Sequence, residues 1–199
     1  MRVICCYHAE REARSALALS RYAPGAELVK TPGLFGYNEA IASRWTGEND
    51  LVVIEADKEI MADVLPSFEV CGHRWCCYAH SIYPMPFTRN VACGLGCVRF
   101  SAEVQRLVDP SEFLHEDFDW LLPCRDCGGK GCWRYLDTRI AWALFEHGIF
   151  PHVHGYVEHH HVYPDDWGKA GPGERPPPIP AAEAIDVKAR WLAAIAARR

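Results

Sequence analysis

The order of apolar runs and polar breaks in the first fifty residues predicts a strand, a helix and a second strand. Residues 3–7 (V-I-C-C-Y) form a short apolar run, with cysteine acting as a small hydrophobic residue. Residues 12–21 are rich in Ala, Leu and Arg, which favour a helix, and residues 27–30 are a second short strand. This order and spacing begin a doubly wound α/β sheet.

The strongest apolar run is Leu51-Val-Val-Ile54, which is unbroken and mostly β-branched, as is typical of a strand buried on both faces of a parallel sheet. Glu55 and Asp57 follow it directly. Side chains two residues apart in an extended chain point the same way, so we expect both carboxylates where ligands bind in open α/β sheets. Such a pair suits a Mn²⁺ or Mg²⁺ ion that also holds phosphate oxygens, and the alternative is a solvated acidic turn.

The remaining pattern continues the alternation of helices and strands. Helices are expected at residues 37–45, 60–65 (stopped by Pro66), 102–108 (capped by Ser101) and 133–147 (ended by Gly148). Strands are expected at residues 95–100 and 150–156, whereas the aromatic segment 71–89 is expected to be irregular.

These elements predict one α/β domain over residues 1–161 with a cysteine-rich insert at 123–132. Residues 162–180 are rich in Pro and Gly, which predicts a linker or a tail that follows the surface. Residues 181–199 are Ala-rich with apolar side chains on one face, which predicts a C-terminal helix.

Composition narrows the class of protein. With 49% hydrophobic residues the chain can build a core, and its net charge of −5 does not favour a free-standing nucleic-acid binder. We expect no membrane span, because no apolar run approaches the roughly 18 residues needed. The ten cysteines and the absence of a signal peptide lead us to expect reduced thiols in the cytoplasm.

Two further groups of residues carry candidate chemistry. Asp137 lies at the start of the amphipathic helix, where it could act as a general base or simply favour the helix dipole. His152 and His154 share a face if their segment is extended, as metal ligands should, although a surface histidine tract would look the same. Of these histidines, and of the triplet at 159–161, His154 is the one that we select as a ligand.

A third group, Cys124, Cys127 and Cys132, lies in a glycine-rich turn and is similar to a zinc knuckle. Three local thiols leave a structural zinc site one ligand short. His115, Cys93, Cys97 or a late histidine would have to complete it, and free thiols or a disulfide are the alternatives.

Together these parts resemble GT-A type glycosyltransferases, and in particular the small glycosyltransferase-like proteins of actinobacterial phages. The resemblance covers residues 1–161 and rests on five features in a fixed order. These are the V-I-C-C-Y strand, the Tyr37-Asn38-x-Ala40 helix, Glu55-x-Asp57, the L-G-C-V-R-F-S segment, and Asp137 followed by a histidine strand.

The resemblance implies a Rossmann-like GT-A sheet and a nucleotide-sugar donor. Glu55 and Asp57 would hold the metal and the diphosphate, with Glu55 on either the ribose or the metal, and His154 would complete the metal shell. The donor-binding residues would be Tyr7, His8, Glu10, Tyr37, Asn38 and Glu55.

The expected function is therefore metal-dependent transfer of a sugar to an acceptor hydroxyl, with Asp137 as base and inversion at the anomeric carbon. The acceptor is a virion protein, a modified DNA base or a small molecule, and the sequence does not distinguish these three. The alternatives are a Cys/His metal-dependent nuclease or phosphodiesterase, and a non-enzymatic zinc-stabilised binding module.

Overall fold

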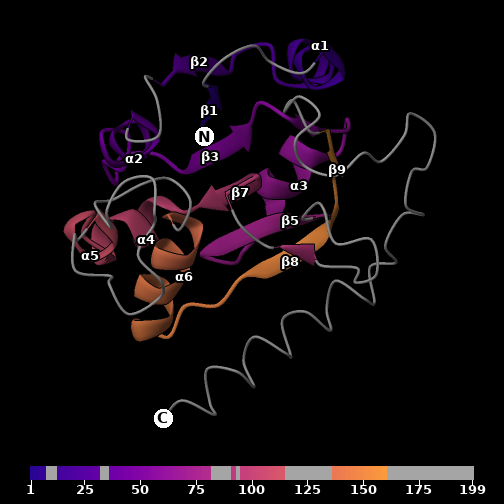
Figure 1. Ribbon diagram of the computed structural model, residues 1–199. Helices are drawn as coiled ribbons and strands as arrows, with labels where there is room; N and C mark the ends of the chain where they lie inside the picture. The colour runs from indigo at the N-terminus through magenta and orange to yellow at the C-terminus, as the bar shows by residue number, and fades with distance from the viewer. Residues whose placement is uncertain (8–12, 32–35, 82–90, 93–94, 115–135, 161–199) are drawn as a thin grey trace.

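The computed structural model describes residues 1–7, 13–31, 36–81, 91–92, 95–114 and 136–160. Its helices are α1 (Ala13–Tyr22), α2 (Gly36–Ala42), α3 (Val64–Val70), α4 (Ala102–Leu107), α5 (Ser111–Leu114) and α6 (Leu136–Glu146). Its strands are β1 (Arg2–Tyr7), β2 (Glu27–Lys30), β3 (Leu51–Glu55), β4 (Lys58–Glu59), β5 (Trp75–Ser81), β6 (Val91–Ala92), β7 (Cys97–Phe100), β8 (His152–Tyr156) and β9 (Glu158–His159). Figure 1 shows the central sheet with helices on both sides.

The sheet is mostly parallel, in the order β2-β1-β3-β7-β5-β6, with β8 also paired to β5. Strand β1 is parallel to β2 and β3, and β5 is parallel to β8. Strand β7 is antiparallel to both neighbours, so β5 and β8 run in the same direction as β3. The predicted α/β architecture, a mostly parallel sheet flanked by helices, is confirmed.

The core consists of two apolar layers, one on each face of the sheet. Leu51 and Val53 face the layer formed with α2, α4, α5 and α6. Val52 and Ile54 face the layer formed with α1 and α3. All four side chains are fully buried, so the prediction of a strand covered on both faces is confirmed.

Two predicted helix boundaries are confirmed at atomic level. The Ser101 hydroxyl accepts a hydrogen bond from the Val104 backbone N–H at 3.2 Å, as an N-cap does. Gly148 follows α6 with a positive φ of 69°, a conformation that glycine adopts without a steric penalty.

The helix predicted at residues 60–65 is wrong, because α3 starts at Val64 and runs through Pro66 to Val70. Pro66 lies in the first turn, where its missing N–H would have had no intrahelical partner. The proline therefore helps to begin this helix rather than to stop it.

The expectation of an irregular segment at 71–89 is wrong for Trp75–Ser81, which form β5 between β7 and β8. The prolines that led to this expectation lie beyond residue 81, outside the described residues. The predicted insert at 123–132, the linker, the C-terminal helix, His8 and Glu10 also lie outside them. No helix in the described part of the chain has the length and apolar character to cross a membrane.

Candidate functional site

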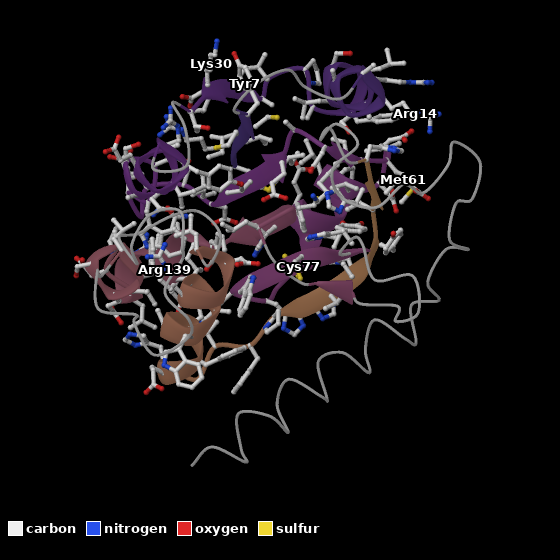
Figure 2. The ribbon with its side chains drawn as sticks, in the orientation of Figure 1. Tyr7, Arg14, Lys30, Met61, Cys77 and Arg139 are labelled. Carbon is white, nitrogen blue, oxygen red and sulfur yellow. The ribbon has the colours of Figure 1, made fainter. Side chains whose placement is uncertain are left out.

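The acidic pair lies where β3 leaves the sheet. Glu55 is the last residue of β3 and pairs with Cys6 of β1, so Tyr7 at the end of β1 lies at the same edge. Tyr7 in turn pairs with Lys30 at the end of β2, and both are seen at the top of Figure 2. The ends of three parallel strands therefore meet at the carboxyl edge that the sequence predicted.

The two carboxylates converge, and they do so on a lysine. The Lys58 ammonium Nζ is 2.8 Å from Glu55 Oε2 and 2.6 Å from Asp57 Oδ1. The Lys58 side chain is only 1% exposed, whereas those of Glu55 and Asp57 are 25% and 22% exposed. A buried cation thus joins two acids that each keep some surface in water.

This arrangement shifts the ionisation of both partners. Burial alone would lower the pKa of Lys58, but the Glu55 and Asp57 carboxylates outweigh it and raise that pKa. Burial would raise the pKa of Asp57, but a hydrogen bond from His159 and the charge of Lys58 hold it well below its usual range. Lys58 and Asp57 are therefore both charged at neutral pH.

The histidine that contacts the acidic pair is His159. Its Nε2 lies 2.8 Å from Asp57 Oδ2, because β9 pairs antiparallel with β4 and sets His159 opposite Lys58. The next residue, His160, donates its backbone N–H to the Asp57 carbonyl and has its ring Nε2 2.6 Å from Glu59 Oε2. Two members of the histidine triplet thus hold the turn that carries Asp57.

The selection of His154 as the histidine of this site is corrected by these contacts. His154 stands in β8, where its ring stacks on Tyr78 at 5.6 Å between centroids and meets the Phe68 ring edge-on at 5.7 Å. The chain reaches Asp57 only after β8 ends and β9 begins. Sequence spacing places a histidine on a face, but the pairing partner of β9 decides which acid it meets.

The acidic pair does not fit a divalent cation held by both carboxylates. The Lys58 ammonium already occupies the point at which Glu55 and Asp57 converge. Gly96 makes room for it, since a Cβ there would lie 2.5 Å from Lys58 Cε and 2.6 Å from His80 Cε1. Like charges repel strongly where little water screens them. A Mn²⁺ or Mg²⁺ ion therefore cannot bind between the two carboxylates while the Lys58 ammonium is there.

The residues predicted to bind the donor come together in part. The Tyr37 hydroxyl of α2 donates a hydrogen bond to Glu55 Oε1 at 3.4 Å, and Asn38 is buried on the same helix. Burial and the nearby Glu55 charge raise the pKa of Tyr37 well above its usual value, so it stays a donor.

Asp137, the candidate base, is far along the sequence from Tyr37, Asn38 and Glu55. It is half-buried in the first turn of α6. Helix α6 packs its apolar residues into the same core layer as Tyr37, the residue that contacts Glu55.

A second group combines one cysteine with two histidines. The ligand atoms of Cys71, His152 and His154 all lie within 4.8 Å of one another. The expectation that His152 and His154 share a face is confirmed, because their rings meet edge-on with centroids 4.8 Å apart. Cys71, the C-cap of α3, was missed by sequence reasoning, although the Cys71-x-His73 spacing mirrors His152-x-His154.

The other described cysteines are core residues. Cys5, Cys6, Cys76, Cys77 and Cys97 are buried, whereas Cys71 is partly exposed. Burial raises the pKa of both Cys6 and Cys76 to about 12, so these residues are neutral thiols. Cys124, Cys127 and Cys132, predicted to bind zinc, lie outside the described residues.

Comparison with known proteins adds little to this geometry. No family model matches the chain. No curated protein matches it. Among solved structures, one described as the crystal structure of A197 from STIV is similar with 14% identity and a TM-score of 0.46, covering 79% of this chain and 83% of that one. A likeness this weak carries no argument about function.

Proposed function

We propose that the chain transfers a sugar from a nucleotide-sugar donor to an acceptor hydroxyl. The observation that carries the proposal is the pair of partly exposed carboxylates, Glu55 and Asp57, held rigidly by buried Lys58 at the carboxyl edge of the sheet. This edge is where open α/β folds bind nucleotides. A carboxylate that is already fixed can accept hydrogen bonds from ribose or sugar hydroxyls without losing conformational freedom on binding.

The roles follow from position. Glu55, oriented by the Tyr37 hydroxyl, binds a donor hydroxyl, and Tyr7 flanks it from the end of β1. Asp137 takes the proton of the acceptor hydroxyl as that oxygen attacks the anomeric carbon. The bond from that carbon to the diphosphate breaks, its electron pair leaves with the nucleoside diphosphate, and the configuration inverts. Because Glu55 and Asp57 do not fit a bridging metal ion, the proposed mechanism uses none at this position.

Donor binding is tested first. UDP- and GDP-sugars should raise the melting temperature of the full chain in EDTA, and Glu55→Gln should weaken binding about tenfold through loss of one charge-assisted hydrogen bond. Glu103→Gln, which changes an exposed carboxylate on α4, is the matched control and should bind normally. Stabilisation that appears only with Mn²⁺ would contradict metal-free binding, and stabilisation by DNA alone would favour the nuclease.

Turnover is tested separately. Asp137→Asn should leave donor binding unchanged and lower the transfer rate at least about 100-fold, because general base catalysis typically contributes that much. Glu146→Gln, at the exposed far end of α6, is the control and should retain full activity. Transfer is followed by mass spectrometry with DNA, protein and small-molecule acceptors. Full activity in Asp137→Asn would show that another group is the base.

A non-enzymatic, zinc-stabilised binding module is the second candidate, and the Cys71, His152 and His154 group is the observation that favours it. The two functions differ in one measurement. A module would show no transfer and no donor hydrolysis with any nucleotide sugar.

A further inference from the structure

The group around Cys71 has the geometry of a metal site that needs little adjustment. Tetrahedral zinc with one sulfur and two nitrogen ligands sets its ligand atoms about 3.5 Å apart. The atoms of Cys71, His152 and His154 already lie within 4.8 Å of one another. Side-chain rotations that move these atoms by about 1 Å would bring them to zinc-ligand spacing.

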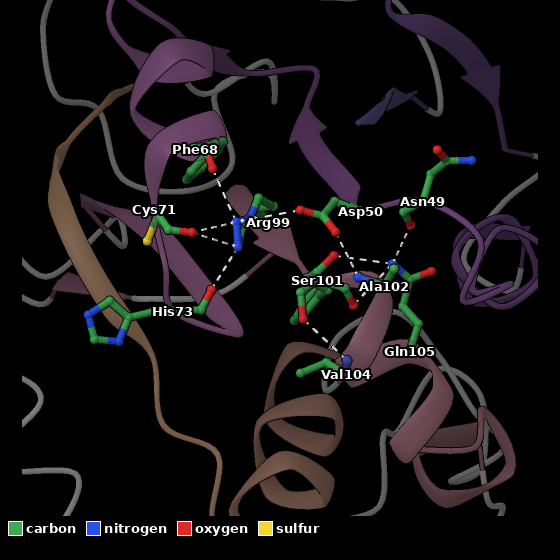
Figure 3. Close-up of polar contacts among 11 residues, drawn as sticks. Asn49, Asp50, Phe68, Cys71, His73, Arg99, Ser101, Ala102, Val104 and Gln105 are labelled. Atoms are coloured by element: carbon green, nitrogen blue, oxygen red, sulfur yellow. Dashed lines mark hydrogen bonds and ion pairs between the residues drawn. The ribbon is translucent and has the colours of Figure 1, made fainter.

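The fold positions each of these ligands. In the pairing of β5 with β8, Cys77 lies opposite Val153 and Tyr78 opposite Gly155, so His154 is the extra residue of a β-bulge. The His154 ring lies beside that of His152, with centroids 4.8 Å apart. The Arg99 guanidinium donates to the carbonyls of Cys71 and His73, which fixes the end of α3 (Figure 3).

The chemistry of the group also indicates a metal. His154 Nε2 is buried, and no hydrogen bond to it is formed within the part of the chain that the structure describes. A third ring, His73, stacks on His152 at 4.2 Å with an interplanar angle of 4°.

We propose that Cys71, His152 and His154 bind a zinc ion that joins the end of α3 to β8. One thiolate and two imidazoles suit zinc and do not suit Mg²⁺ or Mn²⁺, which prefer oxygen ligands. Each of the three ligand residues is partly exposed, so water would supply the fourth ligand. His73 orients the His152 ring by stacking. The site is independent of the proposed glycosyl transfer.

Metal counting tests the site despite the other cysteines of the chain. The full-length protein is stripped with chelator, saturated with zinc, desalted and measured by elemental mass spectrometry. Cys71→Ser and His154→Gln should each lose one equivalent of zinc, and the double variant should also lose one. His147→Gln, which changes a histidine paired with Glu112, should lose none. A double variant that loses two equivalents, or single variants that lose none, would overturn the proposal.

A second measurement needs no variant. Cys71 is partly exposed whereas the other described cysteines are buried, so zinc should slow the alkylation of Cys71 at least about tenfold and EDTA should restore it. Peptide mass spectrometry measures the alkylation rate of Cys71, with buried Cys97 in the same sample as the internal reference. Zinc at about 100 times its dissociation constant should also raise the melting temperature by about 5–10 °C. Equal alkylation of Cys71 with and without zinc would refute the site.

Discussion

Replacing Lys58 with methionine is expected to lower the free energy of unfolding by about 3 kcal/mol at pH 7. The Lys58 ammonium is buried and lies within 2.8 Å of Glu55 and Asp57, so its removal leaves two carboxylates facing each other without a counter-charge. Urea unfolding followed by tryptophan fluorescence measures the change. Lys30→Met, at an exposed position on β2, is the control and should fall within about 0.5 kcal/mol of wild type.

The pH dependence separates this cause from simple loss of packing. The folded pKa of Asp57 is depressed, so its contribution is complete above the unfolded value of about 4 and is lost as the pH falls toward the folded pKa. The folded pKa of Lys58 is raised, so its contribution is complete below the unfolded pKa of about 10.5 and is lost as the pH rises through the folded pKa. The full ion-pair contribution therefore spans about pH 5 to 10.

In Lys58→Met the Asp57 carboxylate loses the Lys58 charge, so the folded pKa of Asp57 rises toward its unfolded value. The wild type then loses more stability than the variant on acidification, so the difference between them should shrink as the pH falls from 7 to about 3. A difference that stays constant over this range would show that lost packing, rather than charge, is the cause.

Replacing Arg99 with methionine is expected to cost about 3–5 kcal/mol of unfolding free energy. The side chain is 5% exposed, and its guanidinium donates to the carbonyls of Phe68, Cys71 and His73 at 2.7–3.1 Å. It also lies 3.5 Å from Asp50 Oδ2. Loss of the guanidinium leaves these carbonyls near the end of α3 without their hydrogen-bond donor, and it leaves the Asp50 carboxylate without its cation (Figure 3).

Two further variants sharpen this result. Arg99→Lys should recover only part of the stability, since one compact ammonium cannot serve three carbonyls in the plane of a guanidinium. Arg74→Met, which removes an exposed ion pair with Glu103, is the control and should cost about 1 kcal/mol or less. Thermal unfolding measures all three. An Arg99→Lys variant as stable as wild type would contradict the role assigned to the guanidinium.

The acidic pair shows how far sequence reasoning reaches at the site. Glu55 and Asp57 meet at the end of β3 as expected, but Asp57 lies in the turn after the strand, so the period of two in an extended chain is not the reason. The sequence did not predict Lys58 between them, because that residue looks like any solvated lysine in a polar turn. Burial of Lys58 depends on Gly96 and β9, which are distant along the chain.

The histidines and Cys71 show the same division. The alternation of His152 and His154 predicted a shared face, which the structure confirms. The cysteine that joins them lies about eighty residues earlier, and it comes close only because β5, just after Cys71, pairs with β8.

Within the chain, the sequence alone determined the properties that depend on near neighbours. These are the doubly buried strand β3, the cap at Ser101, the end of α6 at Gly148 and the faces that alternate along each strand. The tertiary structure alone decided which side chains meet: Lys58 with both acids, His159 with Asp57, and Cys71 with His152 and His154. The reason is physical, since local periodicity sets the direction of a side chain, whereas its partner depends on the register between strands far apart in the sequence.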